Sequence, residues 1–98
     1  MSETDAPAEL VALKLRFLTV DAELSALART LPSSMAIAGG EAELTEAQRA
    51  AWDGLQGTLT ELAVRIHRHP AFEGLSGPDR LKLDQEASRV AKAAFVMA

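Results

Sequence analysis

The side chains best suited to chemistry lie in the run Arg65-Ile66-His67-Arg68-His69, which contains both histidines of the chain. Two histidines bind one metal ion when they lie four residues apart on a helix, because they then share a face. His67 and His69 are two residues apart, so they point away from each other on a helix. No carboxylate lies at a ligand spacing from them, and we predict no metal site. The run instead offers a basic surface to an anion or an acidic partner, formed by Arg65, His67, Arg68 and His69.

The other residue types that catalyse reactions lack the neighbours that they need. No serine lies in a nucleophile elbow, and Gly39-Gly40 is a hinge or turn rather than a phosphate-binding loop. The helical carboxylates have basic neighbours four residues away, in the pairs Glu61–Arg65, Arg80–Asp84 and Lys82–Glu86. With no cysteine, thiolate metal sites are excluded. We predict that the chain is not an enzyme and binds no cofactor.

The composition describes one small helical domain, residues 1–98. Hydrophobic residues make up 48% of the chain but aromatic residues only 4%. Much of the apolar fraction is alanine, which favours helices that approach one another closely. The net charge of −4 makes nucleic acid an unlikely primary partner, because neutralising phosphates requires a concentrated basic face.

Two observations on the sequence bear on where the protein is expected to be located. The longest apolar runs are a few residues, far short of the ~20 that span a bilayer. The first nine residues, MSETDAPAE, are acidic and lack the basic and apolar regions of a secretory signal. We therefore expect a cytoplasmic, bacterial-type protein with no membrane contact.

The clearest helix is expected over residues 45–69. Thr45 and Gln48 have the spacing of a capping box, and Pro70 ends the helix at the preceding residue. Apolar residues at alternating spacings of three and four form one seam along this helix: Trp52, Leu55, Leu59, Leu62 and Ile66. Gly54 and Gly57 lie off this seam. Either they are tolerated there, or another backbone or a ligand approaches them closely.

The first helix, expected over residues 8–31, is apolar on two sides. Its main seam keeps the three–four spacing for three heptads: Leu10, Leu13, Phe17, Val20, Leu24, Leu27 and Leu31. A second apolar set, Val11, Leu15 and Leu18, lies roughly 100° or more around the helix. A two-sided helix requires two surfaces to pack against, and we expect the second to be another copy of the chain. The predicted self-association residues are Val11, Leu15, Phe17 and Leu18.

The remaining segments are a linker, a connector and a third helix. Residues 32–44 form a linker made flexible by Gly39-Gly40. In the connector after Pro70, Phe72 and Leu75 are spaced to anchor a single helical turn onto the core. Pro78 opens a helix expected over residues 78–97.

Two short stretches resemble known families. Trp52-Asp53-Gly54 is similar to the Trp-x-Gly motif of small proteins secreted by type VII systems, which are helical hairpins with the motif in the bend. The capping box at Thr45 places Trp52 inside a helix instead, and Pro70 breaks what would be the second arm. The resemblance therefore does not transfer that function.

The stretch from Leu13-Lys14 through Asp21, Leu24 and Leu27 resembles the first helix of the dimeric all-helical chorismate mutases. Pro32 ends the helix where that family continues it. The later catalytic lysine and glutamine positions of the family have no counterpart here. We therefore do not predict mutase activity.

The sequence thus predicts an all-α fold, an antiparallel three-helix bundle that dimerises through its first helix. Its expected function is a non-catalytic protein–protein interaction and assembly module. One alternative is a nucleic-acid-linked regulator, antitoxin-like or phage-derived, that uses Arg65, Arg68, Arg89 and Lys92. Another is a small-molecule binder with a groove between helices lined by Trp52, Phe72 and Phe95.

Overall fold

The computed structural model describes residues 6–97, and this part of the chain is all-α, as the sequence predicts. The helices are α1 (Ala8–Ala28), α2 (Ser34–Ala38), α3 (Glu46–His67) and α4 (Gly77–Met97). A 3₁₀ turn, η1 (Pro70–Phe72), joins α3 to α4. No strand is present in residues 6–97.

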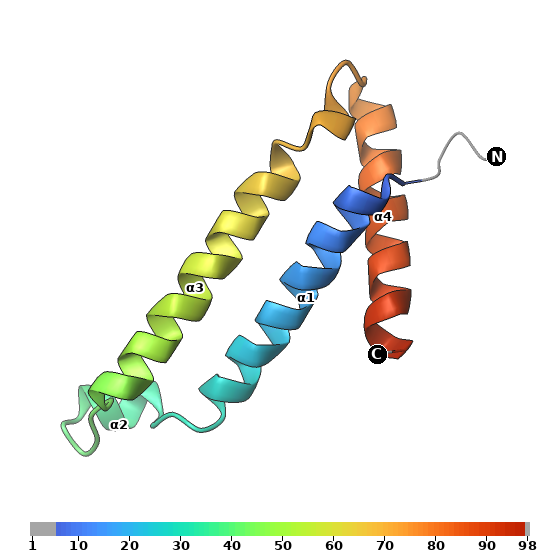
Figure 1. Cartoon of the computed structure of the whole chain (residues 1–98). Helices are drawn as coiled ribbons and strands as arrows, with labels where there is room; N and C mark the ends of the chain where they lie inside the picture. The colour runs from blue at the N-terminus through green and yellow to red at the C-terminus, as the bar shows by residue number, and fades with distance from the viewer. Residues whose placement is uncertain (1–5, 98) are drawn as a thin grey trace.

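The three long helices form an open arrangement with α1 between the other two (Figure 1). α3 runs antiparallel to α1, and α4 runs in roughly the same direction as α1. α3 and α4 contact each other far less than either contacts α1. α4 also leans away from its neighbours towards its C-terminal end, so only α1 and α3 pair at the end that carries α2.

Local signals explain where α3 begins and where η1 forms. The Thr45 hydroxyl accepts the Gln48 amide at 3.0 Å, and the Gln48 side chain accepts the Thr45 amide at 2.8 Å, so the predicted capping box is present. After α3, Nδ1 of His69 accepts the amide of Ala71 at 3.1 Å and caps η1. The turn that the sequence predicts around Phe72 is therefore present.

The first half of the segment expected to be a flexible linker contains α2. The Ser33 hydroxyl accepts the amide of Ala36 at 3.1 Å and caps this short helix, and Gly40 follows it with a φ of 74°. α1 ends at Ala28, three residues before Leu31, where the apolar seam places its end.

The tightest packing lies where η1 meets α1 and α4, and we call this region the core end. Leu10 and Ala87 have no exposed surface there, and Phe72 is 5% exposed. Ile66 and Val11 pack against this cluster. Phe72 therefore anchors the connector as predicted, whereas the prediction is wrong for Leu75, which is 39% exposed.

We call the opposite region the hairpin end. It consists of α1 from Val20 onward, α2, and α3 up to Leu59. Val20 and Leu24 are buried there. The other large apolar residues of its two long helices remain half-exposed.

Candidate functional site

A trough of about 650 Å³ lies between α3 and α4, with α1 as its floor. It exists because α3 and α4 pack on different sides of α1 rather than on each other. Its apolar lining comes from all three helices and η1: Phe17, Leu18, Ala63, Ile66, Phe72 and Leu81. Its polar lining consists of Lys14, His67, Arg80, Asp84, Ser88 and Lys92.

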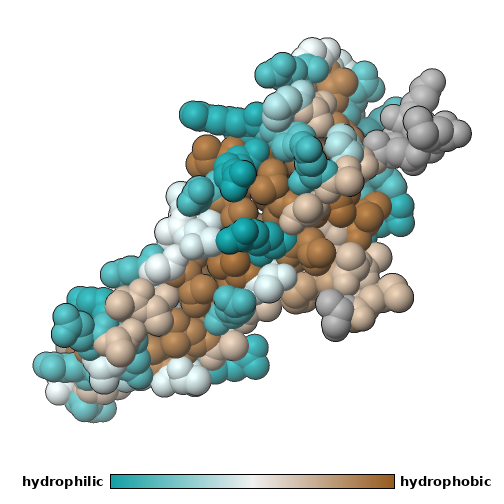
Figure 2. All heavy atoms as spheres, viewed as in Figure 1, coloured by the Kyte–Doolittle hydropathy of each residue, from teal (hydrophilic) through white to brown (hydrophobic). Residues whose placement is uncertain are grey.

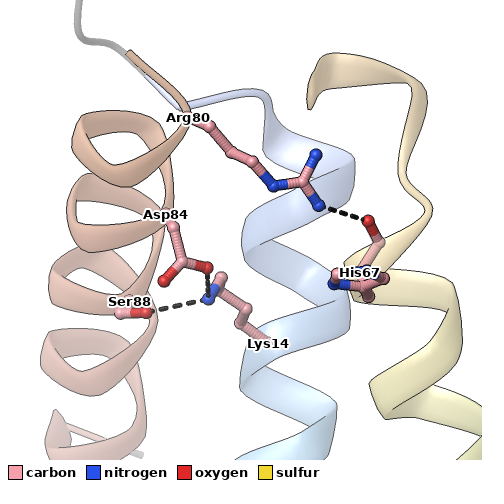
Figure 3. A network of polar contacts seen from close by, with 5 residues as sticks. All are labelled: Lys14, His67, Arg80, Asp84 and Ser88. Carbon is pink, nitrogen blue, oxygen red and sulfur yellow. Dashed lines mark hydrogen bonds and ion pairs between the residues drawn. The ribbon is translucent and has the colours of Figure 1, made fainter. Parts of the chain in front are cut away.

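Lys14 on α1 is held by two side chains of α4 (Figure 3). Its Nζ lies 2.6 Å from Oδ1 of Asp84 and 2.8 Å from Oγ of Ser88. The Lys14 side chain is only 13% exposed, whereas that of Asp84 is 47% exposed. The ion pair therefore lets α1 carry a lysine at its interface with α4, because the carboxylate and hydroxyl satisfy the ammonium group.

Arg80 spans the trough near the core end, from α4 to the last turn of α3 (Figure 3). Its guanidinium donates to the backbone carbonyl of His67 at 2.7 Å and lies 4.4 Å from the centroid of the Phe72 ring. Carbonyls in the last turn of a helix lack partners within the helix, so this hydrogen bond also caps α3. Within residues 6–97, no carboxylate forms an ion pair with Arg80.

The spacing of four residues predicted the ion pairs Arg80–Asp84 and Lys82–Glu86 on α4, and both predictions are wrong. Asp84 binds Lys14 rather than Arg80, because α1 brings the ammonium group within hydrogen-bond distance. Glu86 binds Arg89, and this hydrogen bond lowers the pKa of the Glu86 carboxyl although desolvation opposes it. The α4 carboxylates are therefore occupied by partners other than the predicted ones.

The structure divides the predicted basic run between two faces. His67 lines the trough, whereas Arg65, Arg68 and His69 line a separate groove between α1 and α3. Arg16 of α1 joins them there, and no sequence pattern predicts its place beside this run. Nδ1 of His69 accepts the backbone amide of Ala71 and is therefore occupied within the chain.

The predicted self-association residues also have different environments. Val11 packs against the core cluster within the chain. Phe17 and Leu18 line the trough. Leu15 is half-buried and lines neither groove. α4 therefore covers part of the second apolar side of α1 that the sequence left without a partner.

The prediction that Trp52, Phe72 and Phe95 line one groove is wrong for two of the three residues. Phe72 lines the trough, but Trp52 and Phe95 do not. Trp52 belongs to the hairpin end, far along α3 from η1 (Figure 1). The arginines and lysine proposed for nucleic acid are likewise dispersed, since Arg89 binds Glu86 on α4 while Lys92 lines the trough.

Gly54 and Gly57 face open space. A Cβ atom added at either glycine would meet no atom within 4 Å. The interpretation that another part of the chain approaches them closely is therefore wrong within the protomer. Close approach by a ligand or by a second copy of the chain stays a prediction.

The family described as a domain of unknown function, DUF8825, matches residues 9–90. The chain belongs to this family. No curated protein and no solved structure matches the chain significantly. The matched range includes the core end, the hairpin end and every residue that lines the trough except Lys92.

Asp84 is the one carboxylate in the trough lining, and Lys14 occupies it. Residues 6–97 bring no three histidine, aspartate or glutamate side chains together as metal ligands. No helix in this range combines the length and apolar character required to cross a bilayer.

Proposed function

We propose that this chain is a non-catalytic helical assembly module that pairs with a second copy through its hairpin end. The observation that supports this function is the apolar seam of that end, which no third long helix of residues 6–97 covers. Figure 2 shows apolar side chains along the line between α1 and α3 as far as the end with α2. The half-exposed members of this seam and of the segment beside it include Leu27, Leu31, Leu44, Trp52 and Leu55.

At this end Val20 and Leu24 are buried, but the rest of the two seams remains half-exposed. A helix that is apolar over a wide stripe requires more than one neighbour, and α1 and α3 have only each other beyond the reach of α4. Two such hairpins related by a two-fold axis would form a four-helix bundle and cover both seams. Met35 and Ile37 of α2, which are 84% and 40% exposed, extend the same apolar end.

The proposed contact uses the second half of α1 rather than the four residues expected from the sequence. Val11 already packs inside the protomer. Phe17 and Leu18 lie in a trough whose lining has three basic side chains, Lys14, Arg80 and Lys92, against one carboxylate. Pairing two troughs across a two-fold axis would bring these like charges together, which opposes association there.

Light scattering on the full chain tests this proposal. We expect a dimer for the natural sequence and a helical monomer for the double variant Met35→Glu/Ile37→Glu. The matched control is Val96→Glu/Met97→Glu, which adds two charges at positions that are 81% and 87% exposed on the far end of α4. The control is expected to remain dimeric.

Ionic strength provides an independent measurement. Glu41, Glu43 and Glu46 are exposed around the hairpin end. Unlike the trough charges, these carboxylates would lie at the rim of the contact, where water screens them, so added salt should strengthen the dimer slightly. A natural chain that stays monomeric at all concentrations and salts, or a control variant that dissociates as readily as the α2 variant, would rule out the proposed surface.

A cytoplasmic, bacterial setting remains the part of the proposal that rests on sequence alone.

A further inference from the structure

We propose that the core end of the trough binds a small apolar carboxylate. The carboxylate head would lie against Arg80, and the apolar body would lie over Phe17, Leu18 and Ile66. This site is separate from the hairpin end and does not depend on the proposed dimer.

The two basic side chains of the core end differ in whether their charge is neutralised. Asp84 neutralises Lys14, whereas Arg80 has no carboxylate partner within residues 6–97. The Arg80 guanidinium is nevertheless fixed, by the His67 carbonyl at 2.7 Å and by the Phe72 ring at 4.4 Å. A guanidinium has five N–H donors, so most remain available after this one hydrogen bond. Their fork geometry matches the two oxygens of a carboxylate.

The surface below Arg80 suits an apolar body. Side chains of Phe17, Leu18, Ile66 and Phe72 line it, and Leu81 forms part of the α4 wall with 56% of its surface exposed. A volume of about 650 Å³ lies within the range of sites that hold small molecules. Burial of the body supplies affinity, and the fixed guanidinium orients the head.

The charge of the lining and the position of Arg80 together favour a small anion over a peptide helix. The chain has a net charge of −4, yet this lining has three basic side chains and one carboxylate. An anion is therefore the complementary ligand. A helix is about 10–12 Å wide with its side chains. Because Arg80 crosses from α4 to α3 (Figure 3), a partner helix could not continue past it at the core end.

Calorimetric titration of the full chain with decanoate, below its micelle concentration, tests the site. We expect one decanoate per chain with a dissociation constant on the order of 0.1 mM, the range that ligand efficiency allows for a molecule of this size. The uncharged analogue decan-1-ol and the cation decyltrimethylammonium should bind at least about tenfold more weakly, because each lacks the charge-assisted hydrogen bonds.

Two variants of α4 separate a specific head-group site from general attraction. Arg80→Met keeps an apolar contact with Phe72 but removes the guanidinium, and it should weaken decanoate binding about tenfold or more. Arg89→Met is the matched control, because it removes the same charge from α4 outside the trough lining. It should bind decanoate as the natural chain does.

A third variant covers the outcome in which Arg80→Met fails to fold. Leu81→Glu changes an exposed side chain of the trough wall and places a competing carboxylate near Arg80. It should fold and lose decanoate binding. Equal binding of decanoate and decan-1-ol, equal losses in the Arg80 and Arg89 variants, or undiminished binding by Leu81→Glu would each overturn the proposal. So would binding of inorganic phosphate or an acidic peptide in place of decanoate.

Discussion

The core end and the hairpin end are built on the same apolar seam of α1, yet they differ in what covers it. At the core end, η1 and α4 add to the α1–α3 pair, and Leu10 has no exposed surface. At the hairpin end the pair stands alone, and Leu27 and Trp52 remain half-exposed. Val20 and Leu24 of the same seam are nevertheless buried, so the difference between the ends is greatest beyond Leu24, where α1 has the fewest neighbouring elements.

The two ends also differ in charge. The trough at the core end has an excess of basic side chains, whereas Glu41, Glu43 and Glu46 surround the hairpin end. A binding site for an anion and a surface for self-association therefore occupy opposite ends of one chain. This separation allows each proposal to be tested while the other end stays intact.

The largest expected effect comes from comparing a leucine truncation at each end. Leu10→Ala should lower the free energy of unfolding by about 2–5 kcal/mol, because it leaves a cavity in a fully covered site. Leu55→Ala should cost about 1–2 kcal/mol, because that side chain is already partly in water. Urea denaturation measures both, in the Met35→Glu/Ile37→Glu background, so that dimerisation does not contribute. Equal costs would show that the hairpin end is packed as fully as the core end.

The next effect concerns the ion pair that joins α1 to α4 at the core end. Asp84→Ala should cost about 1–3 kcal/mol, because it leaves the Lys14 ammonium 13% exposed and without its carboxylate. Lys14→Met should cost less, because the Asp84 side chain is 47% exposed and water can solvate it. Chemical denaturation of the two single variants decides the order. If Lys14→Met proves the more damaging change, water rather than Asp84 satisfies the ammonium group.

Local signals in the sequence were sufficient for most of the helices. The capping box at Thr45 and the stop at Pro70 act within a few residues, so they do not depend on the rest of the fold. α2 was missed although Ser33 caps it, because a helix of five residues has too little periodicity to recognise. The lean of α4 away from α3 has no local signal, because it depends on packing between distant residues.

The candidate site was predicted less well for the same reason. Phe72 was identified as an anchor from its spacing after Pro70. Lys14 and Asp84 are 70 residues apart, and no pattern in the sequence links them. The hydrogen bond from Arg80 to the backbone carbonyl of His67 could not be predicted either. Every residue has a backbone carbonyl, so the sequence does not indicate which one an arginine will contact. The spacing of four residues on one helix therefore led to the pairing of Arg80 with Asp84.

A smaller effect tests whether the surface of α3 at Gly54 and Gly57 contacts a second copy of the chain. Gly54→Ala and Gly57→Ala should each stabilise the chain by about 0.5–1 kcal/mol, because alanine favours the helix and its Cβ would meet no atom within 4 Å. Thermal denaturation and light scattering on the same samples distinguish two cases. Stabilisation without a change in mass means that these positions lie outside the dimer contact, whereas dissociation means that the partner copy packs against them.

The smallest effect is expected from the exposed pair Glu86–Arg89, which serves as a reference for the ion pair in the trough. Its hydrogen bond lowers the pKa of Glu86 in the folded chain. A lowered carboxyl pKa contributes stability above the pKa of the unfolded chain, about 4.3, and this contribution is lost as the pH falls through the folded value. The melting temperatures of the natural chain and Glu86→Gln should therefore differ slightly at pH 7 and converge as the pH falls through the lowered pKa of Glu86. A difference that persists at low pH would mean that Glu86 acts through packing rather than charge.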